Sequence, residues 1–297
     1  MSTTIFKAGV AVLATAAFAT GALAQASRPA IETTKVEGTD NVYVFRNQNH
    51  QAMFIVTPAG VIATDPIAYG KPQGGQQYLD EIRKISSQPI KYVICSHHHY
   101  DHISGGKAFK DVGARFIAHQ NATARLKALA DPNTVLPDES VGNRGRTIKL
   151  GGTTLELKYY GVNHSDSSLV MYLPKDKIAF AVDWISAGTF PGVGMIDSQP
   201  LQWISALKEV QKLDFARFIP GHPGVGNRTL GDKKDIVELI DILQTASDTV
   251  KAEARAGKCW EPAGKEVQLS KFAKMPGYDN GRPHVVQRFC GLWGRGT

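Results

Sequence analysis

Concentrated charge is the first thing missing from this sequence. The 297 residues carry a formal net charge of +7, yet no run contains five or more like charges. Proteins that bind nucleic acid more often show a basic stripe interleaved with aromatic side chains. The excess is therefore interpreted as a surface balance that favours solubility, and nucleic acid is not expected as a partner.

Internal repeats and a clear membrane span are missing as well. No period of the solenoid kind is visible, which argues against a repeat array. The uncharged stretch at residues 8–23 is short, and rich in alanine and glycine, for a membrane helix. Lys7 precedes it, and an A-x-A cleavage site follows at residues 22–24. This layout predicts a secretory signal peptide over residues 1–24, with an uncleaved membrane anchor as the alternative.

The remainder, residues 25–297, has the composition of a soluble globular domain, with 42% hydrophobic and 21% charged residues over the whole chain. We predict one domain there, with residues 226–297 forming a C-terminal helix and tail. Export would place the protein in the periplasm or outside the cell, without stable membrane insertion once the signal peptide is cleaved.

Cysteine is scarce, with three residues in the whole chain. An exported protein lives in an oxidising compartment, so each cysteine matters. Cys95 lies at the end of an apolar run and is expected to be a buried free thiol. For Cys259 and Cys290, both in the tail, a disulfide and two free thiols are equally compatible with the sequence.

Short β-branched runs punctuated by glycine and proline predict two meanders, each followed by strand–helix pairs. The predicted strands cover residues 41–45, 52–56, 61–65, 90–94, 114–118, 147–150, 153–159, 169–173, 178–182 and 217–220. Apolar residues at helical spacing predict helices over residues 76–85, 122–130, 201–213 and 231–256. Residues 25–35 are interpreted as a polar leader, and the last forty residues show only a weak pattern. The element order predicts an α/β fold with two sheets sandwiched between helices.

A dense group of possible metal ligands follows the predicted strand that ends at residue 94. It reads His97-His98-His99-Tyr100-Asp101-His102. Imidazole and carboxylate bind zinc and similar divalent ions. Side chains alternate in an extended segment, so His97, His99 and Asp101 can share one face while His98 points away. The next turn would bring His102 beside Asp101, so two metal half-sites could begin in one loop. A solvated histidine-rich tract is the alternative.

Three later predicted strands each end near one more possible ligand: His164, Asp183 and His222. Each would be a weak signal alone, because a lone histidine at a strand end is more often a surface or hydrogen-bonded residue. Together they complete an inventory for two ions. The inventory is His97, His99 and His164 for one ion, Asp101, His102 and His222 for the other, and Asp183 as the bridge.

This ordered set resembles the metallo-β-lactamase superfamily of binuclear metallohydrolases, over a stretch from Asp65 to His222. The resemblance implies an αββα sandwich of two mixed sheets flanked by helices, with the metals at one edge. It also implies two zinc ions, with iron or manganese as alternatives, and a small-molecule substrate. By the same resemblance, Asp65 supports a metal-binding histidine from behind.

The departures from the family pattern bear on the substrate. Asp183 at the bridging position is similar to the glyoxalase II and lactonase branches, whereas the better-known β-lactamases have cysteine or serine there. Ser186 replaces a lysine that holds the substrate carboxylate in many lactamases, and the tyrosine common in lactonases is not present. Trp184 and Phe190 are expected to make this rim apolar. No glutathione-binding tail like that of glyoxalase II is recognisable in residues 226–297, so anionic thioesters are disfavoured.

The leading hypothesis is an exported binuclear zinc hydrolase that cleaves a lactone, ester or β-lactam by a metal-bound hydroxide. Asp101 would be both a ligand and the catalytic group that orients the hydroxide and accepts its proton. Two alternatives remain: a mononuclear iron enzyme similar to persulfide dioxygenases, and a non-catalytic metal-binding protein. The oligomeric state is left open.

Several other polar residues are given minor roles. Asn163 and Ser165 could donate to a developing oxyanion or hydrogen-bond within their own loop. The remaining histidines lack metal spacing and are predicted to be structural or at the surface: His50, His119 and His284.

Overall fold

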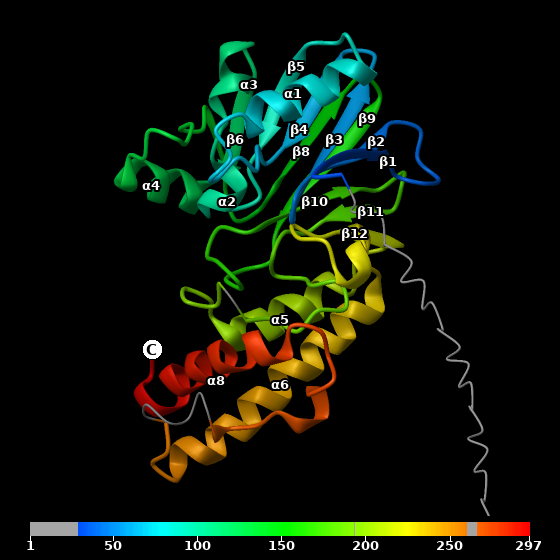
Figure 1. Cartoon of the computed structure of the whole chain (residues 1–297). Helices are drawn as coiled ribbons and strands as arrows, with labels where there is room; N and C mark the ends of the chain where they lie inside the picture. The colour runs from blue at the N-terminus through cyan, green and yellow to red at the C-terminus, as the bar shows by residue number, and fades with distance from the viewer. Residues whose placement is uncertain (1–28, 193, 260–265) are drawn as a thin grey trace, which may run out of the picture.

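The structure, a computed structural model, describes residues 29–192, 194–259 and 266–297. Two β-sheets lie face to face, with helices on both outer sides (Figure 1). The predicted signal peptide, residues 1–24, lies outside the described residues. Among the described helices, none combines the length and the apolar character needed to cross a membrane.

The first sheet has seven strands in the order β1-β2-β3-β4-β5-β6-β7. They are β1 (Ile31–Lys35), β2 (Val42–Asn47), β3 (His50–Thr57), β4 (Gly60–Thr64), β5 (Ile90–Ile94), β6 (Arg115–His119) and β7 (Glu139–Val141). Strands β1 to β4 pair antiparallel, and β4 to β7 pair parallel. The carboxyl ends of β4 and β5 therefore meet at one edge of the sheet.

The second sheet has five strands in the order β12-β11-β10-β9-β8. They are β8 (Arg146–Leu150), β9 (Thr153–Tyr159), β10 (Leu169–Leu173), β11 (Ile178–Phe180) and β12 (Arg217–Ile219). Only β11 and β12 pair parallel, so both sheets are mixed. The parallel pair brings the carboxyl ends of β11 and β12 to the same edge.

The space between the sheets is filled by aliphatic side chains that alternate along each strand. From the first sheet, Val44, Met53 and Ile94 face inward, and they meet Leu157 and Met171 of the second sheet. All of these side chains are buried. In each strand the neighbouring side chains point to the opposite face, so they must be covered by helices.

Helices cover the two outer faces separately (Figure 1). The helices over the first sheet are α1 (Gly74–Ile85), α2 (Tyr100–Ile103), α3 (Lys107–Asp111) and α4 (Gln120–Leu129). Those over the second sheet are α5 (Pro200–Val210), α6 (Lys233–Arg255) and α8 (Tyr278–Arg295). Short 3-10 turns lie at η1 (Val225–Asn227) and η2 (Ser270–Phe272). In α1, the buried residues Tyr78, Leu79 and Ile82 show the spacing of one helix face.

The structure confirms the αββα sandwich of two mixed sheets flanked by helices. It adds the short elements α2, α3 and β7, which were not predicted, and it differs from the prediction at both ends. β1 forms within the predicted polar leader, because this edge strand pairs with β2 from Ile31 to Lys35 and has little apolar pattern of its own. α8 forms in the weakly patterned tail. Its glycines and Pro283 lower the intrinsic helix propensity, and the helix depends on packing against α6.

The three cysteines divide into one disulfide and one free thiol. Cys259 and Cys290 form a disulfide, which ties α8 to the segment after α6. Cys95 is a free, buried thiol, and burial raises its pKa above the usual value. The sequence was equally compatible with a disulfide and with two free thiols at Cys259 and Cys290, and the structure contains the disulfide.

Candidate metal centre

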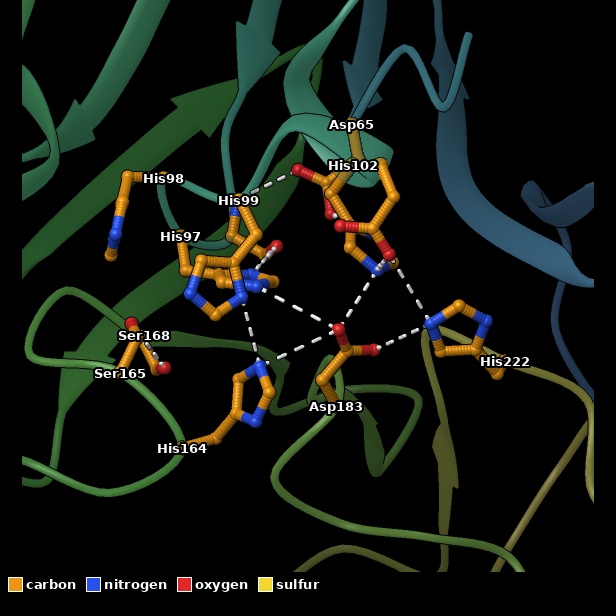
Figure 2. A network of polar contacts seen from close by, with 12 residues as sticks. Asp65, His97, His98, His99, His102, His164, Ser165, Ser168, Asp183 and His222 are labelled. Atoms are coloured by element: carbon orange, nitrogen blue, oxygen red, sulfur yellow. Dashed lines mark hydrogen bonds and ion pairs between the residues drawn. The ribbon is translucent and has the colours of Figure 1, made fainter. Parts of the chain in front are cut away.

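Strand ends bring the predicted ligands to one place. The loop after β5 contributes His97, His99, Asp101 and His102, and α2 begins within it. The loops after β9, β11 and β12 contribute the others: His164, Asp183 and His222. Figure 2 shows His97, His99, His102, His164, Asp183 and His222 converging from separate loops toward a common centre.

Asp183 occupies the middle of this arrangement. Its Oδ2 lies 3.0 Å from His102 Nε2, and 3.7 Å from both His97 Nε2 and His164 Nε2. Its Oδ1 lies 3.3 Å from His222 Nε2. The carboxylate therefore faces both halves of the predicted ligand set.

The backbone around Asp183 is unusual in two ways. Asp183 has φ +65°, a left-handed conformation that costs free energy for a residue with a side chain. Gly221 lies so close that a Cβ there would be 2.5 Å from Asp183 Oδ1 and 2.8 Å from the His102 ring. A side chain at position 221 would therefore displace the centre, which explains the glycine before His222.

The ligand atoms form two overlapping groups. Within each group the candidate atoms lie within 4.8 Å of one another. The first group is His97, His99, His164 and Asp183, and the second is Asp101, His102, Asp183 and His222. The structure thus brings all seven predicted residues together, in the two predicted sets, with Asp183 common to both.

The donor atoms fit a divalent cation. In the part of the chain that the structure describes, several of the buried polar atoms here have no hydrogen-bond partner: His97 Nε2, both ring nitrogens of His102, and Asp183 Oδ1. Buried polar atoms are almost always satisfied. A cation that accepts lone pairs from nitrogen and oxygen would satisfy them together.

Burial and charge set the protonation of the two halves differently. Burial lowers the pKa of His164 to about 4 and holds that of His97 well below its usual value, with neighbouring histidines adding to the effect at His97. Burial also opposes the charged form of His102, but the Asp183 and Asp101 carboxylates outweigh it and raise its pKa well above the usual value. In the first half, His97 and His164 therefore present neutral imidazoles.

Asp65 lies behind the centre, as the family resemblance implied. Its side chain is fully buried, and Oδ1 accepts a hydrogen bond from the Ser96 N–H at 2.7 Å. Its Oδ2 lies 3.6 Å from His102 Nδ1. The carboxylate is thus placed to orient the His102 ring from the side away from Asp183.

Asp197 is a residue of the site that the sequence did not indicate. It lies in the loop between β11 and α5, and its Oδ2 is 3.0 Å from His99 Nε2. Because an ionised carboxylate can only accept, His99 Nε2 must carry the hydrogen, which leaves the Nδ1 lone pair facing His164 at 3.0 Å. Asp197 has no recognisable spacing to the motif, so only the folded chain shows its role.

His50 is placed wrongly by the sequence prediction, which treated it as structural or at the surface. Its Nε2 lies 3.4 Å from Asp101 Oδ2, and its ring centroid is 4.6 Å from that of His222. Its Nδ1 lies 3.1 Å from Lys71 Nζ. The reason is strand direction: β3 runs antiparallel to β4, so His50 at the start of β3 lies beside the end of β4.

The other two unassigned histidines follow the prediction. His119 is buried, stacks on Tyr159 with ring centroids 4.1 Å apart, and accepts a hydrogen bond from the Asn121 N–H at the start of α4. His284 is exposed on α8. His98, expected behind the centre, is buried with its Nδ1 2.9 Å from Ser167 Oγ.

Two other predictions can be compared with the structure. Asn163 and Ser165 serve their own loop, since Asn163 Oδ1 accepts from the Ser165 N–H at 3.3 Å and Ser165 Oγ accepts from the Ser167 N–H at 3.1 Å. Phe190 lines the cavity above the centre, as expected of an apolar rim. The prediction for Trp184 is wrong, because its side chain is fully buried in the core under the second sheet.

The candidate ligands lie in a solvent-open cavity of about 1400 Å³. Asp101, His164, Asp183 and His222 contribute to its lining. Typical ligand pockets have volumes of roughly 300–1,000 Å³, so this one can take a bulky substrate. Such a fold, with a cluster of imidazoles and carboxylates open to a cavity, defines the class of metal-dependent hydrolases.

A sequence model of the Metallo-beta-lactamase superfamily matches residues 71–222, and the chain belongs to this superfamily. It is similar to the metallo-beta-lactamase type 2 of Elizabethkingia meningoseptica, with 25% identity over 196 residues, 62% of this chain and 74% of the relative. The type 2 enzyme of Bacillus cereus is 26% identical over 174 residues, which are 57% of this chain and 64% of the relative.

Solved structures share the fold. The metallo-beta-lactamase from Pontibacter korlensis superposes with a TM-score of 0.63 at 21% identity, covering 72% of this chain and 99% of that one. The DIM-1 metallo-beta-lactamase gives a TM-score of 0.63 at 18% identity, with 73% and 99% covered. The chain is therefore a metal-dependent hydrolase of this superfamily, and its His/Asp clusters indicate a divalent metal.

Proposed function

We propose that this protein is an exported binuclear zinc hydrolase that cleaves a carboxylic derivative, namely a lactone, an ester or a β-lactam. The observation that carries the proposal is the double ligand set around Asp183, with one group of three histidines and one group of two histidines and Asp101. A site for one ion would not need the second group, and a scaffold protein would not need either group to open into a large cavity.

The proposed ligands divide into two sets, one for each zinc. His97, His99 and His164 would hold one zinc, and Asp101, His102 and His222 the other, with Asp183 between them. Zinc in such a site acts as a Lewis acid that polarises a carbonyl and lowers the pKa of bound water. Asp65 and Asp197 orient His102 and His99 through the ring nitrogens that face away from the centre.

Asp101 is the proposed catalytic residue. Its carboxylate is partly exposed, lines the cavity, and lies 3.3 Å from His102 Nε2 and 3.5 Å from His222 Nε2. Burial favours the protonated carboxyl, but the close imidazoles of His102, His222 and His50 hold its pKa far below the usual range. Asp101 is thus ionised at neutral pH and can accept a proton from a water that attacks the substrate carbonyl.

The proposal is tested by metal analysis and a substrate screen on the same purified protein. We expect about two zinc ions per chain from elemental analysis. We also expect hydrolysis of at least one class among lactones, aryl esters and β-lactams, abolished by a chelator and restored by zinc. One iron per chain together with oxygen consumption on a persulfide would instead identify the mononuclear oxygenase alternative. Metal binding without turnover of any class would indicate a non-catalytic protein.

Export is part of the proposal and has its own test. The chain produced with its full N-terminus in a Gram-negative host should be recovered from the periplasm, with Gln25 as the first residue by N-terminal sequencing. A protein that stays in the membrane fraction and retains residues 1–24 would favour the uncleaved anchor.

A further inference from the structure

We infer that the substrate is an uncharged carboxylic derivative with a bulky apolar group, an ester or a lactone, and that anionic substrates are poor ones. This inference rests on the proposed hydrolase function and narrows it. It is drawn from the walls of the cavity, which the ligand residues do not form.

Exposed apolar side chains surround the mouth of the cavity. Ile196 is 91% exposed, and Tyr69 and Leu129 are each 59% exposed, and all three belong to the cavity lining. They come from three separate segments: the loop after β4, the end of α4 and the loop before α5. Large apolar residues gathered around one opening mark a binding surface for apolar ligands.

The apolar surface continues inward from the mouth. Ile185, Phe190, Met195 and Trp203 line the cavity and are otherwise packed into the core beneath the second sheet. Because that core fixes their positions, this part of the wall is preformed. A substrate with a bulky hydrocarbon group can exchange water for this surface, with a gain of about 25 cal/mol per Å² of apolar area buried.

Lysine and arginine do not form these walls. Among the described residues that line the cavity, none is lysine or arginine, and Ser186 lies on the rim three residues after Asp183. Cations near the lining residues contact other protein groups: Arg125 pairs with Asp166 and Arg228 with Asp235. Arg288, Arg282 and Lys71 each donate to a backbone carbonyl, of Ser198, Val267 and Ile67 respectively.

An anionic substrate group gains no partner from these walls. A substrate carboxylate that reaches past the mouth would meet an apolar surface, with no lysine or arginine among the described lining residues. An uncharged group in the same position avoids this cost of desolvation.

The reaction itself fits this charge pattern. One water is consumed, the acyl C–O bond of the ester breaks, the acyl carbon gains the hydroxyl, and the leaving oxygen gains a proton. The product acid ionises at neutral pH. The new carboxylate would form at the floor, beside the candidate ligands, so the walls contact only the uncharged remainder of the product.

Matched substrates test the inference on the zinc-loaded full-length mature protein. We would compare the 4-nitrophenyl ester of octanoic acid with the mono-4-nitrophenyl ester of octanedioic acid, which has the same chain length and ends in a carboxylate. We expect kcat/KM to be about tenfold or more higher for the neutral ester, because the carboxylate must be desolvated without a partner. A ratio near one, or a preference for the anionic ester or an anionic β-lactam, would overturn the inference.

Variants of the wall sharpen the same comparison. Ser186→Lys adds a cation at the rim and should raise kcat/KM for the anionic ester while leaving the neutral ester nearly unchanged. Ile196→Ser should lower kcat/KM for the neutral ester by about fivefold through lost apolar contact. The matched control is Val237→Ser on α6, where the valine is 53% exposed and lies away from the cavity lining. An equal loss in Val237→Ser would contradict the assignment of the wall.

A binding measurement separates this inference from the proposed function. Titration calorimetry with the two corresponding 4-nitroanilides reports affinity whether or not the esters are hydrolysed. If no lactone, aryl ester or β-lactam is turned over, the proposed function fails. The inference then stands if the neutral anilide binds about tenfold more tightly, and it falls if the two bind equally or the anionic one binds better.

Discussion

The floor and the walls of the cavity are built in different ways. The floor consists of the candidate metal ligands, which lie directly after strands. The Asp183 carboxylate contacts their imidazoles at 3.0 to 3.7 Å. The walls consist of loops and helix ends with exposed apolar residues such as Ile196 and Leu129. The floor holds the candidate metal ligands, whereas the walls are formed mainly by apolar side chains.

This difference separates chemistry from substrate choice. A change in the floor should lower turnover of every substrate by a similar factor, since each one needs the same reacting groups. A change in the walls should alter the ratio between substrates and leave the chemistry intact. Asp197 and His50 test this separation of chemistry from substrate choice. Each contacts a candidate ligand of the floor, yet each lies in a segment that also borders the walls.

The largest effect is expected at the centre of the floor. Asp183→Asn keeps the shape but removes the charge shared by both ligand groups. Loss of an outer partner of a metal ligand costs about 10–100-fold, so loss of this shared group should cost on the order of a hundredfold or more in kcat/KM for all substrates. Zinc content by elemental analysis should fall in parallel. Asp248→Asn, at an exposed position on α6, is the control. Two bound zinc ions and wild-type rates in Asp183→Asn would contradict the central role of this carboxylate.

Asp101 should show a large effect on turnover with a small effect on folding. At saturating zinc, Asp101→Ala should lower kcat by about 10²–10⁴-fold, the range for a lost general base. Asp101→Asn, which keeps an oxygen in place, should lose nearly as much. The free energy of unfolding should change little, because the side chain is partly exposed. Both variants are measured by steady-state kinetics and urea denaturation, and near-wild-type kcat in either one would exclude the role in proton transfer.

The sequence predicted which candidate ligands converge at the floor but little of the walls, for a physical reason. His97 to His102 are neighbours in the chain, and His164, Asp183 and His222 each follow a recognisable strand. The local pattern and the order of ligands in the family were therefore enough to predict these residues. Asp197 and His50 reach the site through tertiary packing alone, from a loop and from the start of an antiparallel strand. Trp184 was assigned to the rim because of its neighbour Asp183, yet it points into the core. The fold was predictable in the same measure: alternation gave the strands, while β1 and α8 depend on pairing and packing with distant elements.

Asp197 should behave as part of the floor despite its place in a wall loop. Asp197→Asn removes the charge that fixes the His99 ring, and we expect about 10–100-fold weaker zinc binding, measured by competition with a chromophoric chelator. The neutral and anionic esters should lose rate by similar factors at limiting zinc. Asp111→Asn, an exposed partner of Lys107, serves as the matched control. Unchanged zinc affinity with an altered substrate ratio would place Asp197 with the walls instead.

The smallest effect is expected at His50, which lies against Asp101, His222 and His102 and is not itself in either ligand group. His50→Phe keeps a ring of similar shape against His222 but removes the nitrogen that lies 3.4 Å from Asp101 Oδ2. Asp101 retains its contacts with His102 and His222, so we expect a loss of about tenfold in kcat, in line with a lost hydrogen bond to a charged group of about 1.5 kcal/mol. His50→Gln, which can still donate, should recover part of that loss, and His284→Phe on the surface of α8 should have no effect. If His50→Phe instead changed only the ratio of kcat/KM between neutral and anionic esters, the turn before β3 would act in substrate choice. Asp101, which His50 contacts, would then belong to both the floor and the walls.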